Sequence, residues 1–440
     1  MTSVLFLAYH FPPVGGGGVQ RNVGFVRNLA SLGFRSIVVT GTEQPRGHWA
    51  PPDKSLGERF PAGTEIHRLE GPQPEDSGVW RARFERRLML RSTFTRWWIE
   101  GAEAAGQKHG RLADLVYASM IPYETGEAAV RVARALDKPL VIDLQDPWAL
   151  DEMWMYPTGL HRKVDVGRMR TALRAADAIV MNTHEAVVRV HRAFPELRRK
   201  PIVAIPNGFD PHDFAGETEL RADGRFRIVH TGYLHTADGL RLRKVRRARR
   251  LLGGTYTDVD ILTRSHVYLM HAIQRLLTRD PSLASTLELH LAGVLTREDR
   301  EVAAGSPVVR MPGYVSHDES VALVRSADLL FLPMQDLPRG TRAGLVPGKT
   351  YEYLASRRPI LAAVPEGDAR DLLVEAGSAF VCSPNDVDAM VRILAERLDC
   401  WRRGEPAREP RPEVVARYER PAQARQLARL YERVLNETSR

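Results

Sequence analysis

Short apolar runs alternate with helix-periodic stretches along most of the chain. Residues 4–9 form a nearly continuous apolar run, which is typical of a strand buried on both faces of a sheet. Residues 19–32 follow with apolar positions close to the 3.6-residue period of an amphipathic helix. Similar runs predict further strands at residues 36–40, 65–69, 115–118, 140–143, 178–181 and 202–205. Strands separated by helical stretches predict βαβ units and a parallel sheet with helices on both faces.

The alternation restarts after a junction rich in turn residues. Pro206, Asn207 and Gly208 break the pattern, and a polar stretch at 216–224 follows. Strands are then predicted at residues 226–230, 287–292, 308–311, 329–333, 360–363 and 379–382. We therefore expect an α/β protein of two tandem doubly wound, Rossmann-like domains, 1–215 and 216–400, facing across a cleft. Residues 401–440 are expected to form a linker and a C-terminal helix that packs back on the first domain.

Two stretches interrupt this scheme. Residues 42–79 combine proline, glycine and charge, and residues 236–260 separate the first strand of the second domain from the rest of that domain. The second stretch contains the basic run 241–250, RLRKVRRARR, with seven positive charges in ten residues. A solvated helix or loop face and an anion-binding lid both fit this run. Because like charges repel, we expect it to be disordered without a counter-anion.

Composition excludes several classes of protein. The chain has 440 residues, of which 43% are hydrophobic and 27% charged, as in globular proteins. No apolar run approaches the ~20 residues that cross a bilayer, and the N-terminal pattern is not that of a signal peptide. Two cysteines, Cys382 and Cys400, are too few for a secreted disulfide framework, and their spacing suits no zinc site. These features favour a cytoplasmic protein. The net charge of +9 indicates an anionic partner, but the basic run lacks the interleaved aromatics of a nucleic-acid groove.

Four glycines, Gly15, Gly16, Gly17 and Gly18, connect the first predicted strand to the first predicted helix. Without Cβ atoms, the backbone can approach a ligand and present its N–H groups, and the following helix N-terminus favours negative charge. A flexible turn forced by the preceding prolines is the alternative. The loop is not GxGxxG and no acidic residue ends the second strand, so a nicotinamide dinucleotide is not expected.

Polar residues follow the strand predicted at 140–143. Asp143, Gln145 and Asp146 lie at its carboxyl end, in the sequence IDLQDPW, and are expected to face the cleft. For Asp143, a cap of the departing turn and a functional role fit equally well. For Asp146 we favour a functional role.

The block VPGKTYEYLA predicts a helix that begins near Pro347. Lys349, in its first turn, opposes the helix dipole unless an anion also lies there. Glu352 is one turn deeper, where a carboxylate can accept hydrogen bonds from two ribose hydroxyls. An ordinary amphipathic helix with surface Lys and Glu is the alternative.

These motifs together resemble a retaining glycosyltransferase of family 4, which has the GT-B fold. HFPPVGGGGVQR, KPLVIDLQDPW, IPNGFD and VPGKTYEYLASRRPIL carry the resemblance, which spans nearly the whole chain. It implies a hexosyltransferase-like enzyme that moves a sugar from a nucleotide-diphosphate sugar to an acceptor, with retention, without a cofactor other than this co-substrate. The acceptor stays open among a secondary metabolite, a glycolipid and a polysaccharide precursor, and nucleic acid is not expected as a partner.

The resemblance also assigns residues to roles. It places the loop Gly15 to Gly18 against the donor phosphate and the acceptor, and Glu352 on the donor ribose. Arg264 and Lys349 are expected to hold the diphosphate, with Arg243 and Lys244 as rivals of Arg264. The predicted catalytic set is Asp146, Gln145, Lys349 and Arg264. The predicted donor-binding set is Gly15, Gly16, Gly17, Gly18, Gly232, Gly348 and Glu352.

Two positions depart from the family pattern. The first of the family's two acids, eight residues before Glu352, is replaced by Gly344. Gln145 stands where many members carry a histidine, and an amide cannot accept a proton at neutral pH. A pseudo-glycosyltransferase, a nucleotide-sugar epimerase and a non-catalytic partner protein are therefore alternatives. No acidic pair resembles a metal site, so cationic side chains, not a metal, are expected to stabilise the leaving diphosphate.

Residues 80–98, WRARFERRLMLRSTFTRWW, mix arginines with apolar and aromatic residues. This pattern fits peripheral contact of the protein with an anionic membrane, at the inner face of that membrane. A helical hairpin that lines the acceptor side fits the pattern as well.

Overall fold

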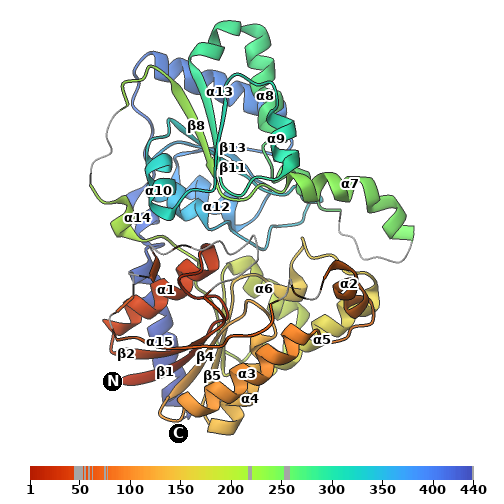
Figure 1. Ribbon diagram of the computed structural model, residues 1–440. Helices are drawn as coiled ribbons and strands as arrows, with labels where there is room; N and C mark the ends of the chain where they lie inside the picture. The colour runs from red at the N-terminus through yellow and green to blue at the C-terminus, as the bar shows by residue number, and fades with distance from the viewer. Residues whose placement is uncertain are drawn as a thin grey trace. The chain divides into compact units, whose positions relative to one another are not determined.

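The computed structural model describes residues 1–43, 53, 56–57, 60–61, 63–73, 76, 78–216, 221–251 and 258–438, with the side chains of residues 17, 79 and 245–251 left aside. The chain forms two compact units, Met1–Gly208 with Tyr418–Arg440, and Phe209–Arg417 (Figure 1). The first boundary falls shortly before the expected junction at 215/216. The chain returns to unit 1 at Tyr418, within the stretch 401–440 that was expected to form a linker and a C-terminal helix.

Unit 1 contains a seven-stranded parallel sheet with the order β3-β2-β1-β4-β5-β6-β7. Its strands are β1 Thr2–Leu7, β2 Phe34–Thr40, β3 Glu65–Arg68, β4 Leu115–Ser119, β5 Leu140–Leu144, β6 Ala178–Met181 and β7 Ile202–Ala204. All are close to the predicted positions. The central strands β4, β5 and β6 are buried along their whole length, which explains their continuous apolar sequences.

Helices cover both faces of this sheet. They are α1 Gly17–Ala30, α2 Val79–Arg87, α3 Thr93–His109, α4 Thr125–Leu136, α5 Gly159–Ala175, α6 His184–Ala193 and α15 Arg420–Thr438. One apolar cluster joins β1 to α1 and α15, including Val23, Leu427 and Tyr431. A second cluster, on the other face, joins the strands to α4, α5 and α6. The C-terminal helix therefore completes one layer of unit 1, beside α1 (Figure 1).

Unit 2 repeats the pattern with six parallel strands in the order β10-β9-β8-β11-β12-β13. The strands are β8 Phe226–Thr231, β9 Leu287–Ala292, β10 Val309–Gly313, β11 Leu329–Pro333, β12 Ile360–Ala363 and β13 Ala379–Cys382. The helices are α7 Thr236–Leu251, α8 Val267–Arg279, α9 Arg297–Ala303, α10 His317–Arg325, α11 Lys349–Ala355, α12 Asp368–Ala376, α13 Val387–Arg402 and α14 Pro412–Ala416. The strand order reverses between β8 and β11, and in unit 1 between β1 and β4. These are the points where open α/β sheets bind ligands.

The basic run is helical. Its backbone lies in α7, so the expectation of a disordered segment is wrong. Acidic neighbours offset part of its charge: Arg241 Nη2 lies 2.7 Å from Asp238 Oδ1, and Arg243 Nη2 lies 2.5 Å from Asp260 Oδ2. Arginine, lysine, leucine and alanine are also good helix formers. The side chains from residue 245 onward lie outside the described part of the run.

Across the described residues, no helix is both long enough and apolar enough to cross a bilayer.

Candidate functional site

The glycine-rich loop of unit 1 leads directly into α1. Gly16, with φ of 110°, is the cap residue, and Gly17 and Gly18 already belong to the helix. Gly16 has no side chain with which to cap the first turn, and that turn contains no acidic residue. The N-terminus of this 14-residue helix therefore favours an anionic ligand.

Gln145 lies against this glycine-rich corner. Its Nε2 donates to Ser119 Oγ at 3.0 Å and to the Gly18 carbonyl at 3.4 Å. A Cβ at Gly18 would stand 2.6 Å from Gln145 Oε1, so a larger residue there would make the Gln145 side chain shift. The structure thus brings together two residues that the sequence places in the site.

Asp143 holds unit 1 together. It is fully buried and accepts hydrogen bonds from Arg21 Nε at 2.8 Å, from Arg21 Nη2 at 3.0 Å and from the Tyr117 hydroxyl. Arg21 Nη1 also donates to the Pro206 carbonyl at 2.9 Å. This ion pair connects α1, β5 and the loop after β7. Asp143 therefore has a structural role in this ion pair, which differs from both the turn cap and the functional role that the sequence suggested.

Two polar side chains lie near Gln145 at the same sheet edge. Asp146 is partly buried. The pKa of Tyr123 is raised mainly by the burial of its own hydroxyl, and the negative charge of Asp146 is the next largest cause. His10 lies three residues after β1, and burial lowers the pKa of its imidazole to about 4. It is therefore neutral at physiological pH. Sequence analysis did not single out His10, although a polar residue at the end of the first buried strand is the signal that identifies it.

A cavity of about 420 Å³ opens at the carboxyl edge of the unit 1 sheet. Its walls come from α2, the first turn of α3, the chain after β5 and α5, and they include Phe94, Trp154 and Tyr156. Asp165 accepts hydrogen bonds from the Tyr156 hydroxyl at 2.6 Å and from Trp148 Nε1 at 3.2 Å. Residues 80–98 therefore form two helical segments that line a cavity.

The corresponding edge of unit 2 gathers positive charge. Gly232 follows β8 with φ of 103°, and a Cβ there would stand 2.9 Å from Lys349 Nζ. Lys349 Nζ lies 3.2 Å from His230 Nε2. His230 Nδ1 lies 3.0 Å from the Phe331 carbonyl, so it carries the proton and leaves Nε2 to accept from Lys349.

Lys349 can take up a proton when an anion binds beside it. Burial, followed by the charge of Arg264, lowers the pKa of Lys349 to about 7, while Glu352 acts in the opposite direction. Burial also lowers the pKa of His235 to about 4, and Arg264 and Lys349 contribute to that shift. The structure therefore brings Arg264, Lys349 and Glu352 close enough to interact. Arg243, a rival of Arg264, is paired with Asp260.

α11 is held under the end of β8 by a further contact. The buried Tyr353 hydroxyl accepts a hydrogen bond from the Thr231 N–H at 3.0 Å, one residue before Gly232. Gly348 precedes the helix as its cap residue, and Glu352 is partly exposed one turn later. Gly344, in the loop before α11, is buried and supplies no carboxylate.

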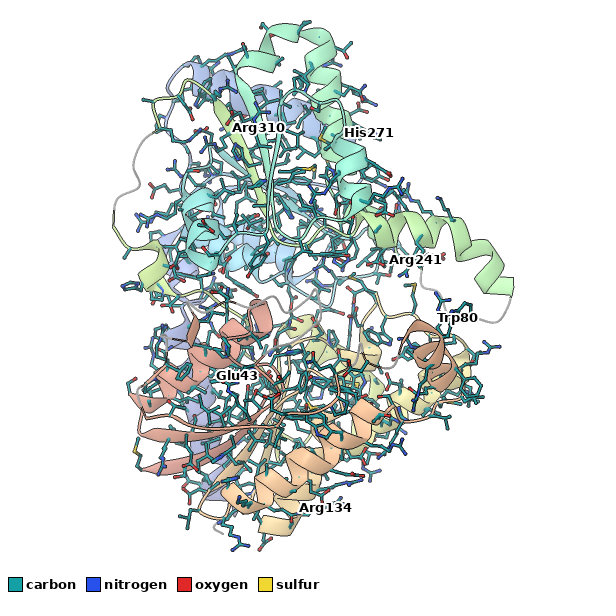
Figure 2. All side chains as sticks on the ribbon, viewed as in Figure 1. Glu43, Trp80, Arg134, Arg241, His271 and Arg310 are labelled. Carbon is teal, nitrogen blue, oxygen red and sulfur yellow. The ribbon has the colours of Figure 1, made fainter. Side chains whose placement is uncertain are left out.

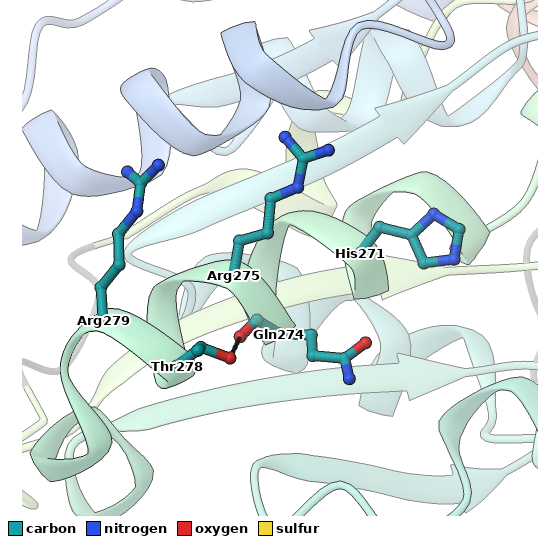
Figure 3. A pocket seen from close by; sticks show the side chains of 5 residues that line it. All are labelled: His271, Gln274, Arg275, Thr278 and Arg279. Atoms are coloured by element: carbon teal, nitrogen blue, oxygen red, sulfur yellow. Dashed lines mark hydrogen bonds between the residues drawn. The ribbon is translucent and has the colours of Figure 1, made fainter.

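A second hollow, of about 450 Å³, lies along the surface of α8 (Figure 3). Its lining residues, His271, Gln274, Arg275, Thr278 and Arg279, all come from this one helix. Thr278 Oγ1 donates to the Gln274 carbonyl at 2.9 Å, and Arg275 pairs with Asp388. A hollow along a single helix lacks the converging walls of a small-molecule site.

Comparison with known proteins matches each of the two units to a glycosyltransferase domain. Residues 16–208 match the family model described as glycosyl transferase 4-like domain, and residues 261–399 match that of glycosyl transferases group 1. By sequence alone, no curated protein matches the chain.

Solved structures agree in fold over nearly the full chain. Sucrose-phosphate synthase from Thermosynechococcus elongatus is 15% identical with a TM-score of 0.64, over 99% of this chain and 100% of that one. Anabaena HepE in complex with UDP and glucose is 13% identical with a TM-score of 0.61, over 98% and 100%. S. aureus MnaA with UDP is 12% identical with a TM-score of 0.56, over 99% and 97%. With both family models and this shared two-sheet architecture, the chain belongs to the family 4 glycosyltransferases of the GT-B fold.

Proposed function

We propose that this glycosyltransferase takes its sugar from a nucleotide-diphosphate sugar bound by unit 2. The observation that carries the proposal is the pair of cations, Lys349 and Arg264, at the carboxyl end of β8, where burial and mutual repulsion lower the pKa of Lys349 to about 7. A diphosphate supplies the negative charge that relieves this repulsion. The UDP in the HepE and MnaA structures supports a nucleotide donor of this class.

The same cations serve the chemical step. In the transfer, the bond from the sugar's anomeric carbon to the phosphate oxygen breaks, and a bond from that carbon to the acceptor forms. Arg264 and Lys349 stabilise the negative charge that develops on the diphosphate. The acceptor proton passes to the departing phosphate oxygen on the same face, which gives retention. This route needs neither a metal nor a strong base, and it fits Gln145, which can only hydrogen-bond.

Glu352 completes the donor site in this proposal. One turn after Lys349, its partly exposed carboxylate is free of the core and accepts the two ribose hydroxyls. In unit 1, the N-terminus of α1, Gln145 and Asp146 orient the acceptor.

We assign the acceptor to the cavity of unit 1. Its aromatic walls suit an apolar group, and Asp165 and Glu124 supply polar partners at one side. Beside the cavity, α2 and its C-terminal cap residue expose apolar side chains that recur every four residues: Trp80 is 82% exposed (Figure 2), and Phe84 and Leu88 are exposed too. Arginines lie between them. An exposed apolar stripe with basic flanks favours contact with an anionic membrane and hence a glycolipid acceptor.

Two assays test these assignments. Thermal-shift screening against UDP-, GDP- and TDP-linked sugars should raise the melting temperature for one nucleotide. Arg264→Ala should abolish that shift, and Arg310→Ala, at an exposed arginine on β10, should keep it.

Sedimentation with phosphatidylglycerol vesicles should carry down the protein, and the double variant Trp80→Ser/Phe84→Ser should stay in solution. Retention of the double variant on vesicles would contradict the membrane assignment.

Gly344 favours one alternative function. Without the acid that touches the donor sugar, the protein would bind the nucleotide but release free sugar or an epimer. Product analysis separates these outcomes: a glycosylated acceptor supports transfer, while hydrolysis or epimerisation alone would overturn it.

A further inference from the structure

Three side chains that could share a metal ion gather at the edge of unit 1. The ligand atoms of Glu65, His67 and His109 all lie within 4.8 Å of one another. His67 Nε2 is 2.7 Å from Glu65 Oε1, and the His67 and His109 rings stack with centroids 3.4 Å apart. Neither the glycosyltransferase resemblance nor the proposed transfer uses these residues.

The fold explains why they meet. Glu65 and His67 are two residues apart on β3, so both point to one face of the sheet. Their partners in β2 are Ile37 and Val39, which belong to the apolar cluster on the face covered by α4, α5 and α6. α3 packs against β1 and β2, and His109 is its last residue. The three side chains therefore come from one strand, β3, and from the end of one helix, α3.

Charged neighbours orient the carboxylate of Glu65. Its Oε1 lies 2.7 Å from His67 Nε2. Arg35 Nη2 holds the other carboxylate oxygen, Glu65 Oε2, at 2.9 Å and leaves Oε1 turned toward the histidines. Lys108 is the remaining charged neighbour that affects His109.

We propose that Glu65, His67 and His109 bind a zinc ion. Two imidazoles and one carboxylate are a set that zinc takes, with water in the fourth position, while magnesium and calcium prefer oxygen ligands throughout. Ligand atoms around tetrahedral zinc stand about 3.3 Å apart, so on binding the His67–Glu65 hydrogen bond must open and the stacked imidazoles must turn their nitrogens toward one point. The side chains of His67 and Glu65 are 24% and 35% exposed, which gives the ion a way in.

The ion would act on structure and not on sugar transfer. β3 is a four-residue strand at the sheet edge, and zinc would tie it to the end of α3. β5, which leads to Gln145, is four strands away in the sheet order, or about 19 Å at about 4.8 Å per strand. Removing zinc should therefore lower the melting temperature and leave turnover intact at a temperature where the apo-protein is folded.

Titration of the tag-free full chain with zinc chloride, followed by calorimetry, tests the proposal. We expect one ion per chain and a higher melting temperature with zinc. His67→Ala and His109→Ala should each weaken zinc binding at least tenfold. His184→Ala, at an exposed histidine on α6 of the same unit, should bind zinc like the wild type.

Two further measurements keep the result clear. Melting curves without zinc establish that each variant is folded, and Glu65→Gln keeps the size of the side chain while it removes the charged ligand. Cobalt should give the absorption bands of a tetrahedral nitrogen–oxygen site in the wild type and lose them in His109→Ala. Equal zinc affinity in the wild type and in the His67→Ala/His109→Ala double variant would overturn the proposal.

Discussion

Raising the pH should weaken the binding of UDP through a single side chain, Lys349. Burial and the charge of Arg264 lower the pKa of this amine from 10.5 to about 7 in the free protein. A bound diphosphate favours the ammonium form and raises the pKa again. Well below pH 7 the amine carries its proton in both states, so Lys349 adds no pH dependence to the affinity there. Above pH 7 the free protein has lost the proton that the complex keeps, and binding must take one up.

The size of the effect follows from the titration curve. Half of the free Lys349 is protonated at pH 7 and about a tenth at pH 8, so the affinity for UDP should fall about fivefold over that unit and about tenfold over the next. UDP itself contributes little above pH 7, because its terminal phosphate titrates near pH 6. His230 is neutral throughout, since burial and Lys349 hold its pKa well below the usual value.

Calorimetry in buffers of different ionisation enthalpy measures the proton uptake directly. We expect about half a proton per UDP at pH 7 and about one at pH 8 and above. Lys349→Met should bind UDP weakly at every pH and take up no proton. A constant affinity between pH 7 and 9, or the same decline in Lys349→Met, would refute the reasoning.

Three further predictions follow from the structure. Glu352→Ala should weaken donor binding by roughly 2–3 kcal/mol, as measured by calorimetry, because a charge-assisted hydrogen bond is lost; unchanged affinity would remove Glu352 from the donor site. Asp143→Ala should lower the free energy of unfolding by about 3–5 kcal/mol in urea titrations, because Arg21 is then buried without its partner; a change below 1 kcal/mol would contradict the role of this ion pair. Turnover should survive EDTA, and recovery only with magnesium or manganese would show that the cations of unit 2 are insufficient.

The sequence predicts the sheets well and the helices unevenly. Buried parallel strands have continuous apolar sequences, so β5 and β11 are found almost to the residue. The basic run was expected to be disordered because its own charges repel. Part of its charge is offset by Asp260, which lies ten residues beyond the run and meets Arg243 only in the fold. Such offsetting partners are invisible to a local pattern.

The site shows the same limit. A carboxylate at a strand end looks identical in sequence whether it binds a ligand or an arginine. Asp143 pairs with Arg21, which lies 122 residues earlier, and no spacing rule connects the two. The sequence pairs Lys349 with Glu352 because they share one turn of helix, and their donor-binding roles stay predictions. His230 was missed because its role depends on burial and on the Phe331 carbonyl.

The two units share one structural feature. In each, a glycine between the first strand and the following helix, or at the start of that helix, lets a polar side chain lie against the backbone: Gln145 at Gly18 and Lys349 at Gly232. Both positions lie where the strand order reverses, at the edge at which such sheets bind ligands. The two side chains differ in charge. An uncharged amide, fixed by Ser119, suits hydroxyls of a sugar or an acceptor, because it gives direction without attracting phosphate. An amine that regains its proton when an anion arrives suits a diphosphate, and it favours the leaving group most as negative charge accumulates there.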